Sequence, residues 1–281
     1  MIDIINIIPK VKECSPAGEG VHRWVYHVLF TFLDHRAEHQ TIIDYCERHA
    51  TRNLQHNEVE NAIGSRLKRQ NIKSKSFSKT NPIIKKRAVD YSITQENLEK
   101  LSPVTNPKDM SSESIIDLLF PNNLLLCCGV SNRTFKTDSK VDWCDSLRKM
   151  RFIVPSPMSA KHGLTQSGKR SPHTLSNTGQ RRFLVVEFDD GTLDQQAAIH
   201  YHLGTKFPLT LIVFSGSKSL HGWYYVQGSK EFHVKEFFNY ACSLGADRAT
   251  WTKSQFVRMP NGVRNNGQKQ SVIFLNPKTI K

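Results

Sequence analysis

Two acidic residues that follow an apolar run are the first candidates for chemistry. The run begins at Phe183, leads into Glu187-Phe-Asp189, and is followed by a turn at Gly191. In a β-strand, residues two apart face the same side and lie about 7 Å apart. Two such carboxylates can hold hard cations, because Mg²⁺ takes one or two carboxylates and completes its octahedron with phosphate oxygens and water. The alternative for this segment alone is a solvated acidic turn after a buried strand.

A second candidate segment, SGSKSLHGW, begins at Ser215 and separates two apolar runs. Gly216 lets backbone N–H groups approach an anion, and the hydroxyls of Ser215 and Ser219 add donors. Lys218 can pair with a phosphate, and His221 can donate to a phosphate oxygen or take part in proton transfer. The alternative is a serine- and glycine-rich hairpin in which the histidine is satisfied locally.

A third segment contributes Asp247 and, after it, Arg258-Met-Pro260. Asp247 can supply a third carboxylate, and arginine is suited to bidentate phosphate binding. The alternatives are a turn residue at a helix end for Asp247 and a surface salt bridge for Arg258.

The charge balance predicts a polyanionic partner. The chain of 281 residues contains 39 Lys and Arg against 25 Asp and Glu, which gives a net charge of +14 and a pI near 9.6. Neutralised phosphates release counterions, so a nucleic acid is the natural partner for such an excess. Lys169, Arg170 and Arg264 are the candidate nucleic-acid contacts. A basic protein without a nucleic-acid role is the alternative.

In their order and spacing, the three segments resemble the archaeo-eukaryotic primase superfamily, which includes primase small subunits and primase-polymerases. Its members carry an acidic D-x-D pair after an apolar strand, an S-x-H core often embedded in S-G-R-R-G-x-H-x-W, a later Asp and an Arg-x-Pro stretch. The counterparts here are Glu187-Phe-Asp189, the segment 215–223, Asp247 and Arg258-Met-Pro260. The resemblance covers roughly residues 151–275.

The resemblance implies a role for each matching residue. The metal ligands for two Mg²⁺ or Mn²⁺ ions would be Glu187, Asp189 and Asp247, which together with His221 form the catalytic set. The nucleotide-binding residues would be Ser215, Lys218, Ser219, His221 and Arg258. The chain departs from the family pattern at Glu187, where Asp is usual, and at Ser217-Lys218, where Arg-Arg is common.

The activity implied by the resemblance is that of a DNA primase or polymerase, which would extend RNA or DNA from NTPs or dNTPs on a single-stranded or primed DNA template. Replication of a mobile element or a phage-like unit is the setting suggested by analogy. Two alternatives stay open: a catalytically weak or inactive primase-like protein that binds nucleic acid in replication initiation or defence, and a metal-dependent nuclease. The chain has no Walker A loop, so any helicase acting with it is expected to be a separate protein.

Three regions must position these residues. The region 1–68 is expected to be a three-helix bundle, with amphipathic helices at 21–33, 41–50 and 57–67, and it resembles the small helical modules that accompany such primases. The region 69–110 is basic and poor in apolar residues, which predicts a linker that either orders on nucleic acid or is a solvated tether.

The region 111–281 is expected to hold the catalytic domain, an α+β fold. Helices are predicted near 114–120, 194–203 and 234–242. Strands are predicted at 124–128, 151–154, 183–189, 209–215, 222–226, 255–258 and 271–275. The resemblance implies a primase-like, RRM-related core in which helices flank an antiparallel or mixed sheet. A polar stretch at 156–180 is too long for a plain turn, and such loops are usually functional or disordered.

Cysteine usage and hydropathy predict where the protein acts. None of the six cysteines forms a C-x-x-C pair, so no zinc is expected. No stretch approaches the roughly 20 apolar residues of a membrane span, and the N-terminus does not resemble a signal peptide. A cytoplasmic protein without a membrane partner is therefore expected.

Overall fold

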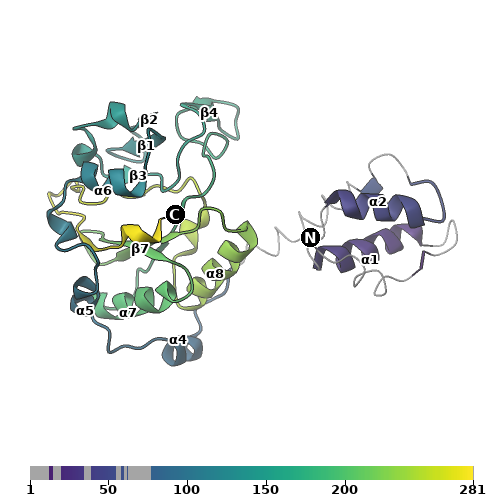
Figure 1. Ribbon diagram of the computed structural model, residues 1–281, viewed down its shortest axis with the longest axis horizontal. Helices are drawn as coiled ribbons and strands as arrows, with labels where there is room; N and C mark the ends of the chain where they lie inside the picture. Colours follow the sequence, from purple (N-terminus) through teal and green to yellow (C-terminus); the bar gives the residue numbers. More distant parts are fainter. Residues whose placement is uncertain are drawn as a thin grey trace. The chain divides into compact units, whose positions relative to one another are not determined.

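The chain is a mixed α+β protein with antiparallel sheets and several helices (Figure 1). The computed structural model describes residues 13–14, 20–34, 39–54, 58–59, 62 and 77–280. It consists of two units, Met1–Ser76 and Phe77–Lys281. None of the described helices is both long and apolar enough to cross a membrane.

The first unit contains two of the predicted helices, α1 (Val21–Asp34) and α2 (His39–His49). Apolar residues at helical spacing on α1, such as Val25 and Leu29, are fully buried against Ile42 of α2, because that spacing places them on one face. The expected third helix, 57–67, lies outside the described residues except for 58–59 and 62, which are helical.

The second unit begins at Phe77, which corrects the expected linker boundary. Helices α4 (Pro82–Ala88) and α5 (Gln95–Lys100) and the 3₁₀ turn η3 (Pro107–Asp109) lie within the segment expected as linker. The Phe77 ring packs 4.8 Å from that of Phe238, and Val89 and Leu98 are buried in the main core. The average hydrophobicity of this segment is low, so its few apolar residues that pack into the core were not recognised from the sequence.

The central sheet has the strand order β10-β7-β8-β6, with every neighbouring pair antiparallel. Its strands are β6 (Phe183–Glu187), β7 (Leu209–Phe214), β8 (Leu220–Tyr225) and β10 (Val272–Leu275). Leu184 and Val186 share a core with helices α7 (Leu193–Gly204) and α8 (Glu231–Ser243). Phe183 and Val185 face the opposite side, as the period of two in a strand requires.

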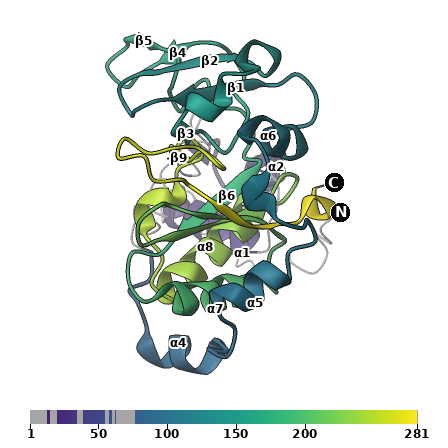
Figure 2. The ribbon, with the colours of Figure 1, turned by 90° about the vertical axis from the view of Figure 1, so that its left-hand side faces the viewer.

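The second sheet has the order β2-β1-β3-β9 and is also antiparallel. Its strands are β1 (Leu125–Gly129), β2 (Phe135–Ser139), β3 (Phe152–Ile153) and β9 (Val257–Arg258). Its inner face packs with α6 (Ser112–Leu119) and Trp223 of the central sheet. Figure 2 shows this sheet above the central one, with α5, α7 and α8 below. The predicted strands therefore divide between two sheets.

Shorter elements complete the second unit. The polar stretch 156–180 contains a two-stranded hairpin, β4 (Gly163–Leu164) and β5 (Arg170–Ser171). A bridge from Met158 to Leu125 joins this stretch to the second sheet, and a bridge from Met158 to Thr178 connects its two ends. The remaining 3₁₀ turns are η4 (Val141–Trp143), η5 (Leu147–Lys149), η6 (Arg248–Trp251) and η7 (Pro277–Thr279).

Candidate functional site

Glu187 and His221 form the centre of the candidate site. Glu187 ends β6 and is paired in register with His221 on β8. By alternation, both side chains share the sheet face of Val185 and Trp223, on the side of the second sheet. The Nε2 atom of His221 lies 3.4 Å from Oε1 of Glu187. Neither ring nitrogen of the buried His221 makes a hydrogen bond within the described part of the chain.

The other two acidic candidates border this pair. The backbone N–H of Asp247 donates to the carbonyl oxygen of Glu187 at 2.8 Å, which fixes Asp247 beside the end of β6. Its Oδ1 also accepts the N–H of Ala249 at 3.0 Å and so caps η6. The side chain of Asp189 is 54% exposed, and its Oδ1 accepts the Ser219 hydroxyl at 3.4 Å.

A tight turn from Ser215 to Ser219 joins β7 to β8 at the end of the central sheet that carries Glu187, which we call the acidic edge. The N–H of Ser215 donates to the carbonyl of Ser219 at 2.8 Å, and the N–H of Ser219 donates to Oγ of Ser215 at 3.2 Å. Gly216 has φ +76, and an added Cβ would lie 2.9 Å from the Lys269 carbonyl oxygen, so this position requires glycine. Lys218 is exposed, with Nζ 3.6 Å from Oδ1 of Asp189.

Two arginines approach the same edge from the C-terminal part of the chain. Arg264 donates through Nη1 to the Ser215 carbonyl at 3.2 Å. Arg258 on β9 is half-buried, and its guanidinium lies 5.0 Å from the centre of the Phe152 ring. The sequence suggested Arg264 as a nucleic-acid contact, and the structure places it against the serine turn.

The charges at this site are strongly coupled. Burial, followed by the negative charges of Asp189 and Asp247, raises the pKa of Glu187 to about 7. Arg258 and Lys218 oppose that rise in pKa. Burial, followed by the charge of Arg258, lowers the pKa of His221 to about 3. At neutral pH His221 is therefore an uncharged ring that offers one N–H donor and one acceptor.

The acidic residues suit an ion that is shared with a phosphate. Among the described residues, no three His, Cys, Asp or Glu side chains form a ready-made metal cluster. Burial and, after it, the charges of Asp189 and Asp247 nevertheless disfavour the ionised form of Glu187 and raise its pKa, and a divalent cation beside Glu187 would offset both effects. Mg²⁺ takes only one or two carboxylates when phosphate oxygens and water complete its shell. Glu187, Asp189 and Asp247 fit such a role.

The two remaining basic candidates lie elsewhere. Lys169 and Arg170 are exposed on the β4–β5 hairpin, which is at the top of Figure 2, whereas β6 is at the centre. A guanidinium nitrogen of Arg170 lies 3.3 Å from Nδ1 of His162 on the same hairpin. These two residues are therefore separate from the acidic edge.

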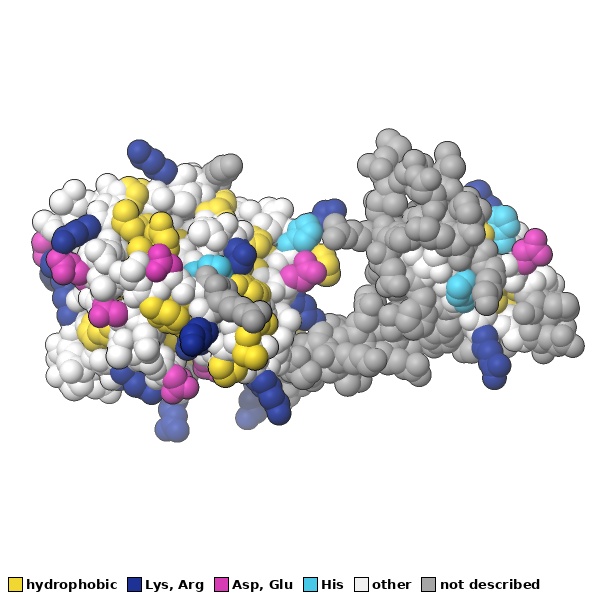
Figure 3. Space-filling model, turned by 90° about the horizontal axis from the view of Figure 1, so that it is seen from below, with side chains coloured by type: hydrophobic (Ala, Val, Ile, Leu, Met, Phe, Trp, Pro, Cys, Tyr) yellow, Lys and Arg dark blue, Asp and Glu magenta, His cyan; other side chains and the backbone are white. Residues whose placement is uncertain are grey.

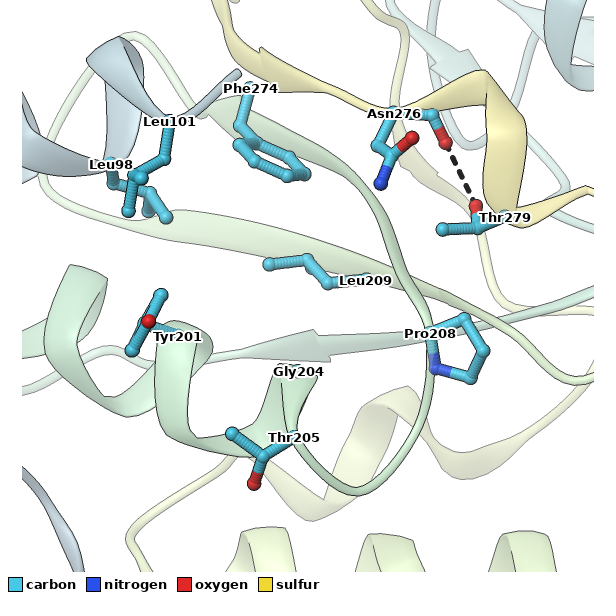
Figure 4. Close-up of a pocket in the computed structure, with 10 residues that line it drawn as sticks. All are labelled: Leu98, Leu101, Tyr201, Gly204, Thr205, Pro208, Leu209, Phe274, Asn276 and Thr279. Carbon is cyan, nitrogen blue, oxygen red and sulfur yellow. Dashed lines mark hydrogen bonds between the residues drawn. The ribbon is translucent and has the colours of Figure 1, made fainter. Parts of the chain in front are cut away.

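A pocket of about 360 Å³ lies on the helix side of the central sheet (Figure 4). Its lining is mostly apolar and consists of Leu98, Leu101, Tyr201, Gly204, Thr205, Pro208, Leu209, Phe274, Asn276 and Thr279. No carboxylate and none of the residues at the acidic edge lines it, so its chemistry differs from that of the candidate site.

The structure adds one supporting residue that no motif identified. His200 of α7 lies under Gly222 of β8, where an added Cβ would be only 2.5 Å from Nδ1 of His200. Its Nε2 lies 3.1 Å from the Leu220 carbonyl and its Nδ1 2.9 Å from the Tyr224 hydroxyl. A glycine inside a strand often indicates such a close approach. Gly222 was therefore the feature of the sequence that could have pointed to a residue such as His200.

No protein-family model matches the chain, and no curated protein or solved structure matches it either.

Proposed function

We propose that the protein is a template-directed nucleotidyltransferase of the primase-polymerase class. The observation that carries the proposal is the convergence at one sheet edge of Glu187, Asp189 and Asp247 with Lys218 and His221. The proposal includes a primase-like, RRM-related fold for the second unit and a primase-associated helical module for the first. The +14 net charge supports a nucleic-acid template as partner.

The basic and polar groups would bind the triphosphate of an incoming NTP or dNTP. Lys218 is exposed and can turn from Asp189 to a phosphate, and the serine turn offers hydroxyl donors. The neutral ring of His221 has no hydrogen-bond partner among the described residues, and a buried unpaired nitrogen is costly unless a ligand satisfies it. Arg258 adds positive charge where the triphosphate would lie. These groups would accelerate transfer through positioning and charge stabilisation.

Two bound Mg²⁺ or Mn²⁺ ions, held by Glu187, Asp189 and Asp247, would supply Lewis-acid stabilisation of the phosphoryl oxygens and activation of the attacking 3′-hydroxyl. The carboxylates of this chain would orient those ions, and Glu187 would do so with one methylene more than the aspartate usual at that position.

The test is a matched pair of variants, Asp189→Asn and Asp190→Asn. Both remove one negative charge from adjacent exposed positions, but only Asp189 shifts the pKa of Glu187. The purified proteins are incubated with single-stranded template, Mg²⁺ or Mn²⁺, and labelled NTPs or dNTPs, with and without a primer. We expect Asp189→Asn to lower synthesis by about 100-fold or more and Asp190→Asn to retain it. The unprimed reaction separates priming from extension.

Other outcomes would favour the alternatives. Asp247 already caps η6, which is the observation that favours a nucleic-acid-binding protein without catalysis. Such a binding protein should bind DNA in a salt-sensitive manner and with equal affinity in both variants. It should form no product with any nucleotide. A nuclease would instead shorten the template in an Asp189-dependent manner. Synthesis that persists in Asp189→Asn would refute the assignment of this site.

A further inference from the structure

An aromatic cluster lies on the second sheet, beside Arg258. It consists of the half-buried rings of Phe135, Phe152, His173 and Phe256. The centroid of Phe256 lies 4.2 Å from that of His173, 5.4 Å from that of Phe135 and 6.2 Å from that of Phe152. The cluster ends at Phe152, where the Arg258 guanidinium lies 5.0 Å from the ring centre.

Strand register places two of the four rings, Phe135 and Phe152, in one row with Arg258 across the sheet. Phe135 on β2 is paired with Gly129 on β1, Gly129 with Phe152 on β3, and Phe152 with Arg258 on β9. Paired residues of antiparallel strands share a face. Position 129 has no room for a side chain, because a Cβ added to Gly129 would lie 2.8 Å from Cβ of Phe135. The row therefore carries two rings and leads to Arg258, a candidate phosphate-binding residue.

Core packing explains only part of this cluster. Phe135 and Phe256 pack against a small buried cluster with Cys127. Phe152, in contrast, belongs to none of the hydrophobic clusters in the described part of the chain, although its neighbour Ile153 is fully buried. The ring of His173 is held by its Nε2, 2.6 Å from the Ser254 carbonyl. The cluster is therefore a fixed surface rather than a set of mobile side chains.

The stretch of sequence that contributes Phe135, Phe152 and His173 is basic. Residues 130–180 contain nine Lys and Arg against three Asp, and one of the three, Asp138, is already paired with Lys136 and Lys161. On the face shown in Figure 3, by comparison, basic and acidic side chains of the described residues are interspersed. Aromatic rings set among cations bind single strands, because every base has a π-face that stacks on a ring while its phosphate meets a cation.

We propose that this aromatic cluster is a stacking surface for nucleobases, and that Phe152 is the ring that receives the base nearest to the acidic edge. The inference rests on the proposed function for its class of ligand, a single-stranded template or the incoming nucleotide. Stacking beside Arg258 would position a base relative to the phosphate-binding groups. A stacking surface of this kind would favour an unpaired strand over a duplex and would not discriminate between base sequences.

The first experiment measures binding without nucleotide and with EDTA, so that it does not depend on catalysis. The probes are a fluorescent dT oligonucleotide and an abasic oligonucleotide with the same number of phosphates. We expect the wild-type protein to bind dT about tenfold more tightly than the abasic strand, as stacking on one or two rings implies. Phe152→Leu should remove most of that difference, whereas Phe152→Tyr, which retains the ring, should preserve it.

Synthesis assays identify the source of the base. If Phe152→Leu raises KM for the nucleotide and leaves oligonucleotide affinity unchanged, the incoming nucleotide is the ligand. Equal wild-type affinity for the two oligonucleotides, together with an unchanged KM in Phe152→Leu, would overturn the proposal. The wild-type comparison needs no variant, so a misfolded Phe152→Leu cannot obscure it. Base-dependent binding without any synthesis would refute the proposed function and leave the stacking surface standing.

Discussion

Acidification should destabilise the protein through His200 before most carboxylates titrate. Burial lowers the pKa of His200 to about 4 from its usual 6.5. The Leu220 carbonyl can only accept, so Nε2 of His200 donates to it, and Nδ1 accepts the Tyr224 hydroxyl. This network requires the neutral ring. Because the pKa is depressed in the folded state, the unfolded chain binds the proton first, and stability falls as the pH decreases from about 6.5 towards 4.

The size of the effect follows from these two pKa values. One extra proton on the unfolded chain changes the free energy of unfolding by about 1.4 kcal/mol per pH unit. Between pH 7.5 and pH 5, His200 should therefore remove about 2 kcal/mol of stability. Urea unfolding of the wild type and of His200→Gln at both pH values measures this loss. Other titrating groups are common to both proteins and cancel in the difference.

The expected result is that the stability difference between wild type and His200→Gln shifts by about 2 kcal/mol between the two pH values, in favour of the variant at pH 5. A difference that stays constant across this pH range would refute the assignment of His200 as a buried neutral histidine.

Three further predictions concern the strand, the turn and the domain boundary. Gly222→Ala should destabilise the fold by about 1–3 kcal/mol, since the added methyl group meets the fully buried His200; an unchanged urea midpoint would show that the ring can move. Lys218→Ala should raise KM for the nucleotide about tenfold without altering thermal stability, because its side chain is 67% exposed; an unchanged KM would remove it from the triphosphate site. A fragment of residues 77–281 should unfold cooperatively. The shorter fragment 111–281 should not, because it lacks the buried residues Val89 and Leu98. Cooperative unfolding of both fragments would show that the folded domain begins at residue 111.

The strands of the central sheet were predictable because each contains at least three apolar residues in succession. The predicted range 183–189 corresponds to Phe183–Glu187, and 209–215 corresponds to Leu209–Phe214. The strand Phe135–Ser139 was missed because it contains a single apolar residue and is stabilised by its pairing with β1. The split into two sheets depends on contacts between distant segments, which local patterns do not contain.

The candidate site contains residues whose proximity follows from local patterns and residues that are brought together from distant segments. Glu187 and Asp189 stand two residues apart in one motif, so their proximity could be expected from local spacing, although β6 ends at Glu187. The proximity of His221 depends on the pairing of β8 with β6. The contact of Asp247 with Glu187 runs through the backbone, and no side-chain pattern encodes it. His200 and Phe152 come from segments without any motif, yet they lie against β8 and Arg258. A mutational survey limited to the motif positions would therefore test the groups proposed for the chemistry and miss His200 and Phe152, which pack beside them.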